Sequence, residues 1–132
     1  MRTTLWFTAL VASLLPPSSL ALPHPQFSFP GLGGSGGSTR NDLNSNICRP
    51  ITVIYARGTG ETGNVGSVAG PPFFSALEDT FGAENVAVQG VDYAATVAGF
   101  VGDPAGNSAM AGMVDKAATS CPDTSIVVSG YS

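Results

Sequence analysis

The sequence predicts an α/β fold, in which a parallel β-sheet lies between helices in a three-layer α/β/α arrangement. Two observations support this prediction. Short segments rich in β-branched residues alternate with longer segments whose apolar residues recur at helical spacing. The resulting order is β-α-β-α-β, and right-handed crossovers make the strands of such an order parallel, with helices on both faces.

Three segments have the composition of strands. Residues 51–55 read ITVIY and are almost continuously apolar, which is typical of a strand that is covered on both faces. A second strand is expected from about Asn85, because valines follow at alternating positions. The third segment, residues 125–129, reads SIVVS.

Two helices are expected between these strands. The first begins at the prolines 71–72, because the first turn of a helix does not need their missing N–H groups, and it ends at Gly82. The second is expected to be capped by Asn107 or Ser108 and to run to about Ser120. The residues expected on its core side are Met110, Met113, Val114 and Ala117.

Residues 1–21 are typical of a secretory signal peptide. Arg2 supplies the positive charge, residues 5–15 form an apolar run of the usual length, and Ser19 and Ala21 are the small residues of a cleavage site. The run is too short to span a bilayer and is followed by two prolines. We therefore expect a secreted, extracellular protein without a stable membrane anchor.

Residues 22–40 are rich in Pro, Gly and Ser and have no apolar periodicity. This composition predicts a flexible leader or propeptide, with the folded part in residues 41–132. The leader contains the chain's one histidine, His24. Arg40 is a weak candidate for a propeptide cleavage site.

Composition excludes several classes of function. The 132 residues allow one domain, and the 11% of charged residues is too low for a self-repelling disordered chain. Nine acids against five bases give a net charge of −4, which excludes a nucleic-acid binder that works through a basic patch. A single histidine argues against a His-based metal site. We expect a monomer without metal or cofactor.

The two cysteines, Cys48 and Cys121, most simply form one disulfide in a secreted chain. A loop of this length restricts the unfolded chain by about 4 kcal/mol in the entropy model. The alternative is a reactive thiol, which is disfavoured because the folded part has no histidine to activate it.

Residues 58–63 read GTGETG and fit the G-x-G-x-x-G pattern of dinucleotide-binding loops, with Asp92 near the position of a ribose-binding acid. In such a site the loop leads directly into a helix whose N-terminus holds the pyrophosphate. Here the helix is expected only from residue 71, and Glu61 places a carboxylate inside the loop. The nucleotide interpretation is therefore disfavoured.

Residues 130–132 read GYS and follow an apolar strand. They match the first half of G-x-S-x-G, the turn that raises a nucleophilic serine above the edge of an α/β-hydrolase sheet. Glycine and serine are also common in ordinary turns, so the three residues alone are a weak signal.

Together, CRPITVIYARGTGETGN at residues 48–64 and the stretch from Cys121 to Ser132 resemble the cutinase family. The resemblance covers essentially the whole folded part and implies an α/β-hydrolase-type fold. It also implies a secreted serine esterase that hydrolyses cutin and related esters through an acyl-enzyme. The alternative within the superfamily is an acetylxylan esterase, since those enzymes share the GYS motif and the cysteine before it.

The resemblance assigns roles to individual residues. Ser132 matches the nucleophile, and Thr59 matches the residue that donates to the oxyanion. Cys48 and Cys121 match the first disulfide of the family. Glu61 and Asn64 either hold the oxyanion loop in shape or are solvated polar residues of that loop; both interpretations are open.

The sequence departs from the family after Ser132, where the second oxyanion donor, the catalytic acid and the catalytic histidine would follow. His24 does not substitute for that histidine from a flexible leader. We therefore expect the chain as written to be an inactive part of such an enzyme, and a truncated sequence is the simplest explanation. A non-catalytic secreted fragment is the competing class.

This expectation is tested by purifying residues 22–132 and assaying ester hydrolysis. No serine-dependent turnover is expected, because a serine hydroxyl without a base is a poor nucleophile. Turnover that disappears in a Ser132→Ala variant would contradict the expectation.

Overall fold

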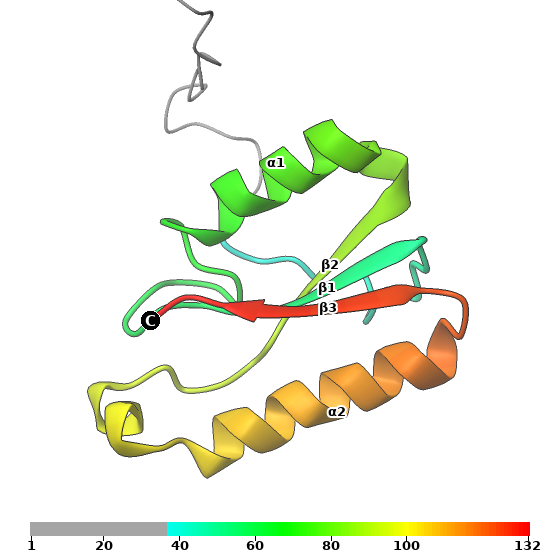
Figure 1. Cartoon of the computed structure of the whole chain (residues 1–132). Coiled ribbons are helices and arrows are strands. Elements are labelled where there is room, and N and C mark those ends of the chain that lie inside the picture. Colours follow the sequence, from blue (N-terminus) through cyan, green and yellow to red (C-terminus); the bar gives the residue numbers. More distant parts are fainter. Residues whose placement is uncertain (1–36) are drawn as a thin grey trace, which may run out of the picture.

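The computed structural model describes residues 37–132 (Figure 1). The expected signal peptide 1–21, most of the expected leader and His24 lie outside the described residues. Within residues 37–132, no helix is long and apolar enough to cross a membrane.

Three parallel strands form the sheet: β1 (Ile51–Ala56), β2 (Val86–Gly90) and β3 (Ser125–Gly130). Their order is β2-β1-β3, so the first strand of the chain is the central one. Val53 of β1 is paired with residues of β2 and of β3 at the same level. The predicted parallel arrangement is confirmed.

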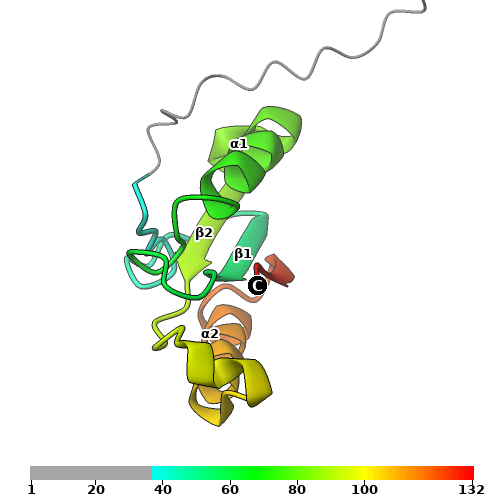
Figure 2. The same ribbon diagram turned by 90° about the vertical axis from the view of Figure 1, so that its left-hand side faces the viewer.

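The helices α1 (Gly70–Phe81) and α2 (Pro104–Ser120) cover opposite faces of the sheet, which gives the predicted three layers (Figures 1 and 2). Prolines occupy the first turn of α1, as predicted. Gly82 ends that helix with φ +89°, a backbone conformation that glycine adopts without the strain other residues incur.

The hydrophobic core has two halves because side chains of a strand point alternately to the two faces. The half on the α1 side contains Val53, Tyr55, Val65, Phe74, Val86 and Val88. The half on the α2 side contains Leu43, Ile54, Val91, Ala117 and Cys121. Met110, Met113 and Val114 pack against this second half, as predicted.

The start of the second helix differs from the prediction. Asp103 is the cap, and its side chain accepts a hydrogen bond from the Gly106 N–H at 2.8 Å. Pro104 then occupies the first turn, so the helix begins before Asn107 and Ser108. Ser108 lies inside the helix, where its hydroxyl donates to the Pro104 carbonyl. An aspartate followed by a proline is a stronger signal for the start of a helix than Asn107 or Ser108.

Two shorter elements were also not predicted. A 3₁₀ turn, η1 (Ala83–Asn85), precedes β2, so the strand begins at Val86 and not at Asn85. A second 3₁₀ helix, η2 (Val97–Val101), lies between β2 and α2, where the sequence predicts no regular element. Single turns of this kind carry little periodicity, and for this reason the sequence pattern does not reveal them.

Packed structure begins before Asn41. The Ser38 carbonyl accepts hydrogen bonds from the backbone N–H groups of Asn64 and Val65, at 2.9 and 3.0 Å. Asn41 forms an antiparallel bridge with Gln89 of β2. The packed part of the chain therefore begins at Ser38, three residues earlier than composition suggests.

The predicted disulfide between Cys48 and Cys121 is confirmed, with a Cα–Cα distance of 5.5 Å. It joins the segment before β1 to the end of α2, across 73 residues of sequence. The bond therefore ties the first strand to the segment that leads into the last one.

Replacing both cysteines by alanine is expected to lower the free energy of unfolding by about 4 kcal/mol, because the unfolded chain regains the freedom of a long loop. Urea denaturation of the oxidised protein measures this change. Reductant should reproduce the loss in the parent protein and leave the double variant unchanged. An unchanged denaturation midpoint in the double variant would contradict the prediction.

Candidate active site

The carboxyl ends of the three strands lie at one edge of the sheet, which is where open α/β sheets bind their ligands. The loop 57–69 follows β1, and Tyr131 and Ser132 follow β3 (Figure 1). Because β1 and β3 are neighbours in the sheet, Thr59 and Ser132 leave it at the same edge. Thr59 is half-buried and Ser132 is exposed.

The backbone conformation changes after β3. The Tyr131 N–H donates to the Ala56 carbonyl at 3.1 Å, which continues the pairing of the two strands by one residue. The next residue, Ser132, has φ +55°, in the left-handed region that side chains other than glycine rarely adopt. A positive φ at a serine directly after a parallel strand is a feature that a nucleophile elbow also has.

The ring of Tyr131 packs on the backbone of the loop after β1. A Cβ atom on Gly58 would lie 2.8 Å from the Cδ1 atom of Tyr131, so only glycine fits at that position. This contact brings the two segments together one residue before Thr59 and one residue before Ser132. Sequence analysis missed this function of Tyr131, because a tyrosine in a turn carries no signal of its partner.

Glu61 holds the loop in shape from inside. Its Oε2 accepts a hydrogen bond from the Gly58 N–H at 2.7 Å, and its Oε1 accepts bonds from Ser67 and Val68 at 2.9 and 2.8 Å. A Cβ atom on Gly66, which has φ +70°, would lie 2.4 Å from Oε2. Of the two interpretations of Glu61, the loop-holding one is therefore correct.

The same carboxylate argues against the dinucleotide interpretation of residues 58–63. Backbone N–H groups of a phosphate-binding loop must point at the phosphate, whereas those of Gly58, Ser67 and Val68 already donate to Glu61. The helix α1 begins only at Gly70, well after the glycine motif.

The environment of Glu61 lowers the pKa of its carboxyl group. Burial alone would raise this pKa, but the three backbone N–H groups and the charge of Arg57 favour the ionised form and outweigh burial. A carboxyl group with a lowered pKa stabilises the fold above its ordinary pKa. That contribution is lost as the pH falls through the lowered value.

Asn64 holds the other end of the loop and is 2% exposed. Its side-chain amide donates to Asn41 Oδ1 at 2.8 Å and to the carbonyls of Arg40 and Gly90 at 3.2 and 3.4 Å. Its Oδ1 accepts a bond from the Arg40 N–H at 2.9 Å. The structural interpretation of Asn64 is therefore also correct.

The segment after β2 is the third part of the fold that holds the loop 57–69 in place. The Arg57 guanidinium lies 5.2 Å from the centre of the Tyr93 ring, and the Tyr93 hydroxyl donates to the Arg57 carbonyl. Arg57 Nε donates to the Glu61 carbonyl, and the Gly60 N–H donates to the Ala95 carbonyl at 3.0 Å. The pairing of an arginine with an aromatic side chain 36 residues away cannot be read from the sequence pattern.

The 3₁₀ helix η2 carries exposed apolar side chains. Three side chains of η2 are largely exposed: Val97 at 72%, Phe100 at 65% and Val101 at 97%. In Figure 1, η2 lies on the same side of the molecule as the C-terminus. Among residues 37–132, no group of three or more His, Cys, Asp or Glu side chains could hold a metal ion.

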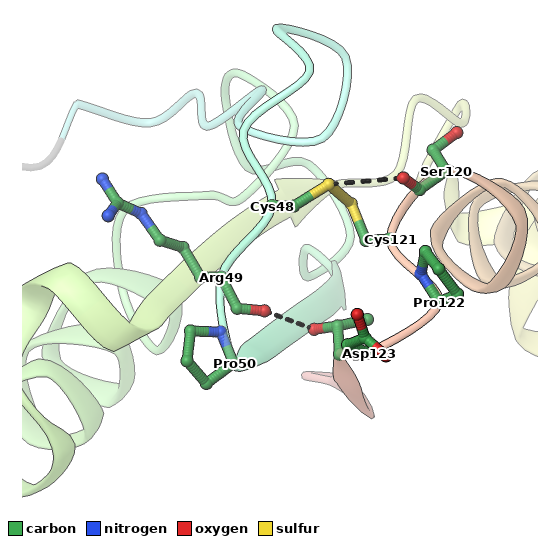
Figure 3. Close-up of a pocket in the computed structure, with 8 residues that line it drawn as sticks. Cys48, Arg49, Pro50, Ser120, Cys121, Pro122 and Asp123 are labelled. Carbon is green, nitrogen blue, oxygen red and sulfur yellow. Dashed lines mark hydrogen bonds between the residues drawn. A yellow bond between two sulfur atoms is a disulfide. The ribbon is translucent and has the colours of Figure 1, made fainter.

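An open hollow of about 440 Å³ surrounds the disulfide at the opposite edge of the sheet (Figure 3). Its lining includes Cys48, Arg49, Pro50, Ser120, Cys121 and Pro122. These residues lie before β1 and before β3, whereas Thr59 and Ser132 lie after these strands. The predicted disulfide residues and the predicted catalytic residues are therefore at separate ends of the sheet.

Replacing Glu61 by glutamine is expected to destabilise the loop, because one side-chain oxygen cannot serve both Gly58 and the pair of N–H groups at Ser67 and Val68. We expect a loss of about 1–3 kcal/mol in the free energy of unfolding at pH 7, measured by urea denaturation. The difference between parent and variant should shrink as the pH falls below the ordinary pKa of glutamate. A variant as stable as the parent at pH 7 would contradict the prediction. Glu84→Gln is the control at an exposed carboxylate that accepts no backbone bond.

Several known proteins are similar to this chain. The sequence model of the cutinase family matches residues 47–132. A cutinase of Botryotinia fuckeliana is 46% identical over 125 residues, which cover 93% of this chain and 54% of that protein. A cutinase of Monilinia fructicola is 50% identical over 93 residues, which cover 69% of this chain and 46% of that protein.

Solved structures agree. The fold resembles the Trichoderma reesei cutinase in complex with a C11Y4 phosphonate inhibitor, with a TM-score of 0.66 and 39% sequence identity. The match covers 73% of this chain and 42% of that chain, so the present chain spans about half the length of the relatives it matches. The motifs, the parallel sheet and these matches together show that the chain belongs to the cutinase family.

Proposed function

We propose that the protein is a secreted carboxylic ester hydrolase of the cutinase type, with Ser132 as the nucleophile. The observation that carries the proposal is the left-handed backbone of Ser132 directly after a parallel strand, beside the loop of Thr59. Secretion rests on the sequence of residues 1–21 and is consistent with the disulfide.

The reaction proceeds in two halves. The Ser132 hydroxyl attacks the ester carbonyl carbon, its proton passes to a histidine, and collapse of the tetrahedral intermediate releases the alcohol. Water then attacks the acyl-enzyme and regenerates the serine. Residues 37–132 contain no histidine, so the base has to come from outside this range.

Thr59 supplies stabilisation of the oxyanion. Negative charge develops on the former carbonyl oxygen, and a preorganised donor aimed at that oxygen contributes about 2.7–4 kcal/mol. The bonds of Glu61 and Asn64 hold the loop before substrate arrives, so the donor does not have to reorganise during the reaction. This rigidity supports the assignment of Thr59.

The exposed apolar side chains of Val97, Phe100 and Val101 favour an apolar ester such as cutin. The alternative, an acetylxylan esterase, would act on a short acyl group attached to a polar sugar. The two activities differ in how turnover changes with acyl-chain length. No nucleic acid and no cofactor takes part in either reaction, and a monomer is sufficient for both.

The test uses the protein that the native source secretes. Its intact mass is measured first, and hydrolysis of p-nitrophenyl acetate and p-nitrophenyl butyrate is measured next. We expect hydrolysis to fall by at least about 10³-fold in a Ser132→Ala variant. A Ser125→Ala variant, at an exposed serine at the start of β3, is the control and should keep the parent activity.

A phosphonate ester should label the parent protein at Ser132 and fail to label the Ser132→Ala variant. Faster turnover of butyrate than of acetate favours the cutinase assignment, and the reverse order favours the acetyl esterase. A folded secreted protein that neither hydrolyses these esters nor reacts with the phosphonate would contradict the proposal.

A further inference from the structure

The four residues Ser38–Asn41 form a short segment, here called the strap, that lies along the loop 57–69, which contains Thr59. The strap contacts three parts of the fold that are distant in sequence: the loop at Asn64, the helix α1 and the strand β2. Composition places the first three of these residues in the leader, yet the backbone of Ser38 and Arg40 makes specific bonds. The strap therefore requires a structural explanation.

The backbone of Ser38 lies directly against that of Gly63. The Ser38 carbonyl accepts bonds from the N–H groups of Asn64 and Val65, and a Cβ atom on Gly63 would lie 1.8 Å from the Ser38 carbonyl oxygen. Gly63 has φ +68°, which independently favours glycine. The loop is therefore built to receive the strap.

Arg40 and Asn41 clamp the side chain of Asn64. The backbone N–H and carbonyl of Arg40 bond to the side-chain amide of Asn64, and Asn41 Oδ1 accepts a further bond from it. Asn64 is buried, so loss of these partners would leave its side-chain oxygen without a partner and its amide N–H groups with the Gly90 carbonyl alone.

The side chain of Arg40 anchors the strap to the frame of the fold. Its guanidinium donates to Glu78 Oε1 on α1 at 3.1 and 3.2 Å and to Asp42 Oδ2 at 3.0 Å. Asp42 Oδ2 also accepts the Val88 N–H of β2 at 2.8 Å. The Arg40 side chain is 23% exposed, so most of it is withdrawn from solvent.

Hydrogen bonds and the backbone segment 64–67 together link the strap to Gly58, the residue before the candidate oxyanion donor Thr59. Ser38 and Arg40 hold Asn64, and the chain continues from there to the N–H groups that donate to Glu61. Glu61 in turn accepts the Gly58 N–H, next to Thr59. The strap therefore restrains the distal end of the same loop that Glu61 restrains from inside.

We propose that the strap is a positioning element of the active site, with Arg40 as a positioning residue for Thr59, and that proteolytic maturation ends upstream of Ser38. The effect on catalysis rests on the proposed esterase function, whereas the effects on loop order and on maturation do not. Cleavage after Arg40 would remove the Ser38 carbonyl and the Arg40 side chain together. Arg40 is therefore not a processing site.

The first test identifies the N-terminus of the protein that the native source secretes, from its intact mass and N-terminal sequence. An N-terminus at or before Ser38 is expected. An N-terminus at Asn41 or later, on a protein whose loop 57–68 is ordered in hydrogen exchange, would overturn the proposal.

The second test compares hydrogen exchange in the parent and in an Arg40→Gln variant of the full secreted protein. Exchange of the Gly58 and Asn64 amides should become about tenfold faster, because one or two partly buried hydrogen bonds are weakened. Exchange of the amides of α2 should stay unchanged, since the hydrogen bonds of Arg40 go to Asn64, Asp42 and Glu78 of α1. Arg40→Lys keeps the charge and should restore part of the protection.

Two further variants keep the test decisive if Arg40→Gln fails to fold. Glu78→Ala removes the anchor on α1 without altering the strap, and it should accelerate exchange of the same amides. Gly63→Ala pushes the strap away, whereas Gly102→Ala places alanine at a positive φ with no atom within 4 Å of the new Cβ. Faster loop exchange in Gly63→Ala alone supports the strap; equal effects in both alanine variants would overturn it.

Kinetics separate this inference from the proposed function. Strap variants should lower kcat with little change in KM, because an oxyanion donor acts in the transition state. Loop exchange that accelerates in a protein without esterase activity would support the strap and contradict the proposed function. Unchanged loop exchange in an active esterase would overturn the strap and leave the proposed function intact.

Discussion

The carboxylate of Glu61 is the interaction on which the candidate site depends. One side chain accepts three backbone N–H groups from both ends of a loop that has no regular secondary structure. Without it, those donors would need water, and the loop would lose its defined shape. The ionised form is favoured by the same bonds, so the charge and the geometry support each other.

The rest of the site follows from the parallel sheet. Parallel strands release the chain at one edge, so the segments after β1 and β3 meet although they are far apart in sequence. The contact of Tyr131 with Gly58 then sets how closely they approach. The disulfide ties the opposite edge, where it stabilises the frame without entering the site.

The sequence predicted the strands, the order of elements and the disulfide because these depend on local periodicity and composition. It misplaced the start of α2, since Asp103 and Pro104 outweigh the capping residues that follow them. The bonds of the strap were missed because they join Arg40 to Asn64 and Glu78, and no local pattern encodes such pairings. The motif GYS predicts a turn after β3, whereas the positive φ of Ser132 cannot be read from the sequence.

The strand order has a consequence for folding. The central strand β1 is synthesised first, and both of its neighbours follow later in the chain. The central strand therefore cannot pair on both sides until β3 has left the ribosome, and these long-range pairings make folding slow compared with that of a helical bundle of similar size. During this interval the apolar central strand is exposed, so assistance by chaperones would suit this topology.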